Sequence, residues 1–188
     1  SPLRAELKGV SLPPEAWRDY VDRLRRSLQV PSWMPIVPGV EIGMPRAEIR
    51  QREVMDFLHP FPGQIIARAR VVDVLLGAGF TGFQPIRVRT QWAKQLKALD
   101  EETPEFYELF VTGSAWRTGI TLDMITVCQH CGRTVFPPSS RLEIDESRWD
   151  GSDFLHIDLN PNIVVVTARV REALESNHFT NWECTAGL

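Results

Sequence analysis

Residues 65–71 read IIARARV and residues 164–170 read VVVTARV, so an Ala-Arg-Val triplet recurs 99 residues further along the chain. The match continues at the same spacing, because Leu75 corresponds to Leu174. Further on, FTGF at residues 80–83 corresponds to FTNW at residues 179–182. A period of 99 residues is too long for a solenoid repeat. We therefore predict an internal duplication, with two related lobes placed about a pseudo-two-fold axis in one domain.

The first copy gives the predicted order of elements within a lobe. Residues 64–68 are a short apolar run that indicates a strand, and residues 69–76 follow with helical spacing. Gly77 and Gly79 end this helix, since glycine accepts the positive φ of a helix C-terminus. Residues 83–89 indicate a second strand, because Ile86 and Val88 alternate in position with Arg87 and Arg89. Each lobe is therefore expected to be a strand–helix–strand unit.

These patterns predict an α+β fold over a single domain, residues 1–188. The two repeat units lie at about residues 60–90 and 160–186. Between them, residues 105–155 form an insert that we expect to contain a β-hairpin carrying a cysteine knuckle at residues 128–132. Candidate strands in this insert are residues 106–112 and 120–127.

The N-terminal part begins with a predicted helix at residues 13–28. Trp17, Leu24 and Leu28 repeat at helical spacing and form an apolar stripe, and Ser11 is suited to cap the helix. Residues 30–45 are rich in proline and glycine, which is typical of an ordered arm or linker.

Composition excludes several classes of protein. The 188 residues carry 21 basic and 24 acidic side chains, for a net charge of −3. That balance argues against a strongly basic nucleic-acid binder and against a disordered chain held open by charge. No stretch approaches the roughly 20 apolar residues that cross a bilayer, and the first residues lack the apolar region of a signal peptide. Three cysteines, an odd number, fit a reducing cytoplasm better than a disulfide framework. We expect a cytoplasmic protein without a membrane partner.

Cys128 and Cys131, in the sequence CQHCG, have the spacing of a zinc knuckle. A gap of two residues lets both thiolates reach one ion, and the following glycine lets the backbone turn toward the sulfur atoms. The pair is only half of a site. Its completion by Cys184 and His178, or by a second cysteine pair outside the given sequence, stays open. A redox pair is less favoured, because no helix begins there to lower a thiol pKa.

A second group of polar residues lies in the sequence WDGSDF at residues 149–154. Asp150, Asp153 and His156 are the candidates for a hydrolase. The favoured interpretation is a tight turn, because Asp and Ser beside Gly bond their own backbone. The sequence contains neither a nucleophile elbow nor a phosphate-binding glycine loop, so it predicts no catalytic residues.

Three features together resemble the myxobacterial double-CxxCG motif family: the CxxCG at residues 128–132, the turn at residues 149–154, and the strand-to-helix segment at residues 163–170. The resemblance runs from about Leu12 to the C-terminus. Members carry two CxxCG motifs, and the first, which precedes a segment like residues 11–28, is not in this sequence. Either the sequence begins after that motif or this member lacks it. Some members resemble immunity proteins encoded beside contact-delivered lipoprotein toxins.

The resemblance implies a binding protein that neutralises a cognate toxin, rather than an enzyme. Tight protein complexes depend on a few aromatic and charged residues. The candidate partner-binding residues are Trp33, Trp92, Trp116, Asp100, Glu101 and Glu102.

An alternative is a zinc-ribbon module that binds nucleic acid or a transcription partner. It requires a second cysteine pair and a basic face, and its binding to nucleic acid would weaken with salt. The net charge argues against nucleic acid as the partner.

Overall fold

The computed structural model describes residues 19, 22–23, 25–26, 46–60, 62–96, 102–127, 134–135, 143–158 and 160–184. The chain divides into two compact parts, Ser1–Pro45 and Arg46–Leu188, and each is described by itself. In the N-terminal part the five described residues are helical, within the helix predicted for residues 13–28. The Arg26 Nε donates a hydrogen bond to the Asp22 carbonyl, 3.2 Å away.

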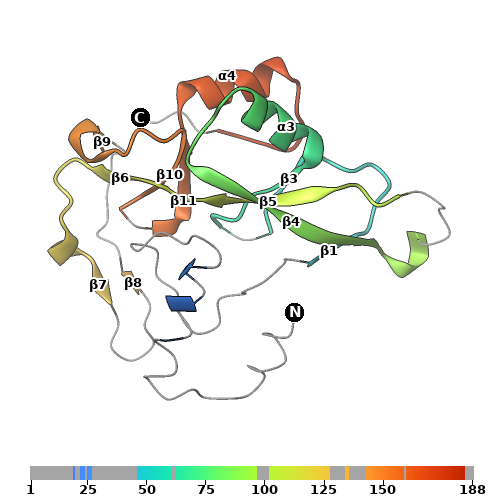
Figure 1. Ribbon diagram of the computed structural model, residues 1–188, viewed down its shortest axis with the longest axis horizontal. Helices are drawn as coiled ribbons and strands as arrows, with labels where there is room; N and C mark the ends of the chain where they lie inside the picture. The colour runs from blue at the N-terminus through green and yellow to red at the C-terminus, as the bar shows by residue number, and fades with distance from the viewer. Residues whose placement is uncertain are drawn as a thin grey trace. The chain divides into compact units, whose positions relative to one another are not determined.

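The part Arg46–Leu188 contains a five-stranded sheet with the strand order β1-β4-β5-β3-β2 (Figure 1). Its strands are mixed in direction, because β1 runs parallel to β4 and the other pairs are antiparallel. The long central pair β4–β5 aligns Phe83 with Val111 and Val88 with Phe106. The strands are β1 (Arg46–Ile49), β2 (Phe57–Leu58), β3 (Ile66–Arg68), β4 (Phe83–Trp92) and β5 (Phe106–Val111).

A four-stranded sheet follows in the same part of the chain, with the order β11-β10-β6-β9. The pair β10–β11 is an antiparallel hairpin, whereas β10 runs parallel to β6. The strands are β6 (Gly113–Arg117), β9 (Ile144–Asp145), β10 (Phe154–Ile157) and β11 (Asn160–Val166). Among the described residues of this part, three short 3₁₀ helices connect the elements, at Lys94–Leu96, Leu122–Met124 and Glu146–Arg148.

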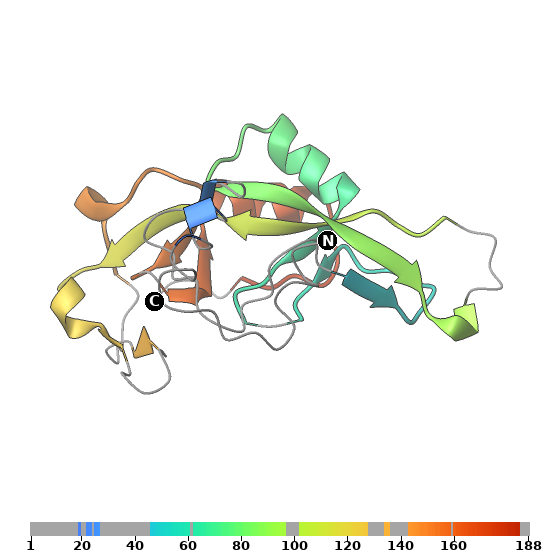
Figure 2. The same cartoon turned by 60° about the horizontal axis from the view of Figure 1, so that its bottom comes forward.

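Two helices, α3 (Ala69–Gly77) and α4 (Ala168–Ser176), lie next to one another on the same side of the strands (Figures 1 and 2). The helical spacing of Val71 and Leu75 puts both side chains in the largest core cluster. Val170 and Leu174 of α4 join them there, so the helices share one core with the inner residues of β5 and β10.

Two glycines let the two sheets approach closely. A Cβ atom at Gly82 or Gly113 would collide with the carbonyl oxygen of Phe154, at the start of β10. Gly82 also has a φ of +84°, which only glycine adopts without strain. The Phe83 and Phe154 rings pack edge to face beside this contact, 4.9 Å apart.

The predicted elements of the first repeat unit are confirmed, with the helix predicted at residues 69–76 and found at Ala69–Gly77. In the second repeat unit the strand and the helix also follow in the predicted order, and α4 begins and ends 99 residues after α3. The final strand of the second unit was wrong, because residues 182–184 form no strand. There Trp182 turns back onto the core and donates a hydrogen bond from its Nε1 to the Phe179 carbonyl, 3.0 Å away.

Residues 105–155 do not form one separate insert. Strand β5 belongs to the five-stranded sheet, whereas β6 and β9 belong to the four-stranded sheet. The strand expected at residues 120–127 was also largely wrong, since residues 122–124 form a 3₁₀ turn before a two-residue strand. This strand, β7 (Thr126–Val127), pairs antiparallel with β8 (Thr134–Val135).

Candidate functional site

Asp56 is a buried carboxylate directly before β2, with 1% of its surface exposed. It accepts hydrogen bonds from the Thr180 backbone N–H at 2.8 Å and the Thr180 hydroxyl at 3.0 Å. The Arg70 guanidinium adds two more, both at 2.6 Å. Asp56 therefore ties the start of the first hairpin to the chain that follows α4.

Asp153 makes the reciprocal connection, directly before β10. Its carboxylate accepts from the Thr81 backbone N–H at 3.1 Å and from the Thr81 hydroxyl at 3.3 Å. The Thr167 hydroxyl donates to the other oxygen at 2.8 Å. The second hairpin is thus tied to the chain that follows α3, just as the first is tied to the chain that follows α4.

We call these two sets of contacts, Asp56 with Thr180 and Asp153 with Thr81, the clasps. Each clasp has an equivalent cation–aromatic contact beside it. The Arg70 guanidinium lies over the Phe179 ring, and the Arg169 guanidinium lies over the Phe80 ring, each 5.2 Å from the ring centroid. A sequence signal for this arrangement was missed: DFLH occurs at residues 56–59 and again at residues 153–156. The two DFLH tetrapeptides are 97 residues apart rather than 99, because the second hairpin is two residues longer.

The charge of Asp56 is stabilised by its partners. Burial by itself raises the pKa of this carboxyl, but hydrogen bonds from Arg70 and Thr180 outweigh that effect and lower the pKa below its ordinary value of 3.8. Asp56 is therefore ionised at neutral pH and held in place by donors.

The candidates for a hydrolase are all engaged in structural contacts. Asp150 accepts from the backbone N–H groups of Ser114 at 2.7 Å and Ser152 at 2.9 Å, which forms the predicted turn. Asp153 belongs to the clasp described above. His156 is 3% exposed, and its Nδ1 lies 3.2 Å from the Ile163 carbonyl. Burial lowers the pKa of His156, with this hydrogen bond opposing the shift.

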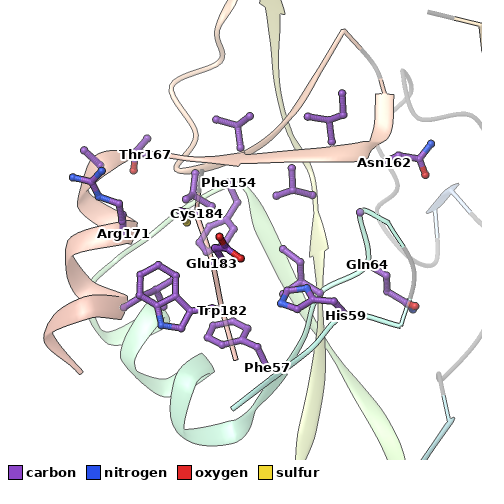
Figure 3. A pocket seen from close by; sticks show the side chains of 18 of the residues that line it. Phe57, His59, Gln64, Phe154, Asn162, Thr167, Arg171, Trp182, Glu183 and Cys184 are labelled. Carbon is purple, nitrogen blue, oxygen red and sulfur yellow. The ribbon is translucent and has the colours of Figure 1, made fainter. Parts of the chain in front are cut away.

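A groove of about 740 Å³ lies beside β11, between that strand, the β2–β3 hairpin and the chain after α4 (Figure 3). Apolar side chains form most of its walls. Figure 3 shows Arg171 and Thr167 at the α4 end, and Asn162 and Gln64 at the opposite end. The Phe57 ring and the Trp182 indole form the side that faces β11 (Figure 3). The groove therefore has largely apolar walls and polar groups at both ends, with the side chains of His59 and Glu183 between them (Figure 3).

The strand β11 is the edge of its sheet, so the groove follows a sheet edge. Ile163 is 40% exposed on this strand, and the run Val164–Val166 is half-buried along the groove. Cys184 lies at the end of the described chain and also lines the groove. Partial desolvation raises the pKa of its thiol above the ordinary value, which keeps the thiol protonated at neutral pH.

The structure separates the candidate partner-binding residues. Trp92 is buried in the core cluster below β4, with 8% of its surface exposed, so it is not available as a surface contact. Trp116 is half-buried, and the Arg148 guanidinium lies 4.0 Å from its ring centroid. Glu102 is exposed. None of these three lines the groove. Trp33, Asp100 and Glu101 lie outside the described residues.

The predicted zinc ligands Cys128 and Cys131 also lie outside the described residues. The segment that holds them connects β7 to β8, which pair as Thr126 with Val135 and Val127 with Thr134. Among the residues that the structure describes, no group of three or more His, Cys, Asp or Glu side chains is placed to hold a metal ion.

No helix within the described part of the chain is both long and apolar enough to cross a membrane. Comparison with known proteins found no matching family model and no matching curated protein. The functional argument therefore depends on the residues of this chain.

Proposed function

We propose that this chain is an immunity protein that binds and neutralises a protein toxin, and that the groove beside β11 is its binding site. The observation that carries the proposal is the combination of an apolar groove with a sheet edge along its length. Such an edge presents backbone donors and acceptors to a partner, and apolar walls supply contact area. The buried carboxylates Asp56 and Asp153 hold this site in shape, because each ties one hairpin to the opposite unit.

The resemblance to the double-CxxCG family supports a toxin as the partner. It depends on the CxxCG at residues 128–132 and on the strand-to-helix segment at residues 163–170, which forms β11 and the start of α4. We also infer a cytoplasmic location, since an odd number of cysteines fits a reducing compartment.

We infer further that the two halves of the fold arose by internal duplication. Support comes from the equal spacing of α3 and α4, the repeated DFLH, and the reciprocal contacts of Asp56 with Thr180 and Asp153 with Thr81. The repeating part is a β-hairpin followed by a helix, rather than a strand–helix–strand unit.

Zinc on Cys128 and Cys131 is part of the proposal as a structural ion. Metal analysis of the purified full chain tests it, with the double substitution Cys128→Ser and Cys131→Ser as the control. Zinc that is retained equally by both proteins would show that these thiols are not its ligands.

The experiment for the immunity function is rescue of growth. Cells that express the neighbouring toxin gene are expected to survive when they also express this chain. Ile163→Glu places a charge on the exposed edge of the groove and is expected to abolish rescue. Leu122→Glu is the matched control, because Leu122 is 65% exposed and does not line the groove. No rescue by the natural chain, with the neighbour itself toxic, would end the immunity proposal. Full rescue by Ile163→Glu would move the interface elsewhere.

A further inference from the structure

We propose that the groove beside β11 receives an extended apolar segment of the partner protein as an additional antiparallel strand. This inference deepens the proposed function and rests on it for the existence of a protein partner. The expected geometry of this added strand comes from the first repeat unit, which contains β3 and α3. There, the corresponding place beside β3 is occupied by β5.

In the first unit, β3 binds β5 through alternate residues. The Ala69 N–H donates to the Glu105 carbonyl at 3.0 Å, and the Leu109 N–H donates to the Ile65 carbonyl at 2.8 Å. Because hydrogen-bonded residues alternate along an antiparallel pair, Ile65, Ala67 and Ala69 direct their backbone groups toward β5. These three residues define the edge that β5 covers.

In the second unit, the residues at the same spacing direct their backbone groups into the groove. The Thr167 N–H donates to the Asp153 carbonyl at 3.0 Å, so Thr167 faces β10. Val166 and Val164 occupy the alternate positions of this ladder and therefore point their N–H and C=O groups away from β10. Ala168, the first residue of α4, continues the same edge. All three line the groove, and in the described part of the chain no strand pairs with this edge.

The first unit also indicates the chemistry of the incoming segment. Tyr107 and Leu109 of β5 lie beside β3 in the sheet; Leu109 belongs to the main core cluster, and Tyr107 packs against it. In the groove, the corresponding surface is apolar and includes Trp182. We therefore expect apolar side chains at alternate positions of the segment.

Charge at the α4 end of the groove adds one more requirement. Glu105 precedes β5 and occupies the α3 end of β3. In the second repeat unit, Arg171 lines the α4 end of the groove, where its Nε lies 3.7 Å from a Glu175 carboxylate oxygen, and Glu183 lines the groove as well. Because the Arg171 side chain is still 46% exposed, a carboxylate just before the apolar positions of the segment could pair with this guanidinium beside Glu175. The segment expected is thus acidic at its first position and apolar at the third and fifth.

The probe for this proposal is a fluorescent peptide with the sequence of residues 104–112, PEFYELFVT. Saturable binding to the full chain, measured by fluorescence anisotropy, is expected. N-methylation at the positions of Tyr107 and Leu109 removes the two donors directed at β11, and should weaken binding about 30-fold. The matched peptide, N-methylated at the positions of Glu108 and Phe110, should bind as well as the parent, since those donors point the other way.

A single substitution in the protein tests the same edge. Ala168→Pro removes one N–H from the groove, and proline suits the first position of a helix. The preceding Thr167 has a ψ of 160°, which proline requires of its neighbour. Binding of the probe should weaken about fivefold for the lost hydrogen bond, with the urea midpoint unchanged. Hydrogen exchange should slow at residues 162–168 when the peptide binds.

Several results would overturn the strand proposal. They are no binding at about 1 mM peptide, equal effects of the two methylation patterns, or slowed exchange at β2 instead of β11. A dimer of the chain alone that Ala168→Pro dissociates would assign the edge to a second copy. If growth rescue persists while the peptide fails, the toxin binds elsewhere and the immunity function stands. If rescue by the natural chain fails, the proposed function itself is lost.

Discussion

Replacing Asp56 by alanine is expected to destabilise the fold more than the same change at Asp153. The Asp56 carboxylate accepts four hydrogen bonds, two from Arg70 and two from Thr180. Removing one partner of a buried ion pair costs about 3 to 5 kcal/mol. The Arg70 side chain is 55% exposed and regains water, so the lower end, about 3 kcal/mol, applies. Asp153 accepts three hydrogen bonds from neutral donors, and its ion pair with the exposed Arg169 is long, at 3.9 Å, so we expect about 2 kcal/mol for this change.

Urea unfolding of the two variants measures this difference. With a slope of about 2 kcal/mol per molar urea, the midpoint should fall by about 1.5 M for Asp56→Ala and about 1 M for Asp153→Ala. Thr180→Val and Thr81→Val are matched partners, and each should show coupling to its own aspartate and none to the other. Equal midpoints for the natural chain and Asp56→Ala, or coupling of Thr180 to Asp153, would refute the reciprocal clasp.

The pH dependence gives the same prediction a second readout. The folded-state pKa of Asp56 is lowered from 3.8, so the carboxylate stabilises the fold above the unfolded-state value. That contribution is lost as the pH falls below about 3.8 and through the folded-state pKa. The difference in stability between the natural chain and Asp56→Ala should therefore shrink between pH 5 and pH 2. A difference that stays constant over this range would show that the charge of Asp56 plays no part.

Three more predictions follow from single positions. Burial lowers the folded-state pKa of His156 below 6.5, so the neutral imidazole gives its full contribution to stability above pH 6.5. The free energy of unfolding should decline as the pH falls below that value. His156→Gln should remove this slope from urea midpoints measured between pH 7 and pH 5. Gly113→Ala should lower the melting temperature severely, by an amount equivalent to about 3 kcal/mol or more, because the new methyl collides with the Phe154 carbonyl. Gly77→Ala, where a methyl meets nothing within 4 Å, should instead leave the melting temperature unchanged or raise it.

Local patterns predicted the elements whose side-chain spacing decides their structure. The helix from Ala69 and the strand from Phe83 begin where the sequence indicates, because apolar spacing and glycine act within a few residues. Trp92 was misplaced as a surface residue, since nothing local tells which face of β4 meets the core. The pairing of β10 with both β6 and β11 depends on long-range register, which periodicity does not encode.

The groove was missed for a related reason, although its sequence signal exists. A comparison at the constant offset of 99 aligns the helices but passes over DFLH, because the second hairpin contains two extra residues. When the DFLH tetrapeptides are included in the alignment of the two repeat units, β2 corresponds to β10 and β3 to β11. The sequence then predicts that β11 has an edge equivalent to the edge of β3 that β5 covers.

The two units differ most where the groove lies, and this difference is itself informative. An open sheet edge is a liability, because its unpaired backbone groups invite aggregation. The first unit covers the edge of β3 with β5, whereas the second leaves β11 along a groove with apolar walls. Each repeat unit is fastened by its own buried aspartate, Asp56 or Asp153, so the lack of such a contact does not account for the open edge. A partner that supplies this strand gives a physical reason for an edge that no strand of the described residues covers.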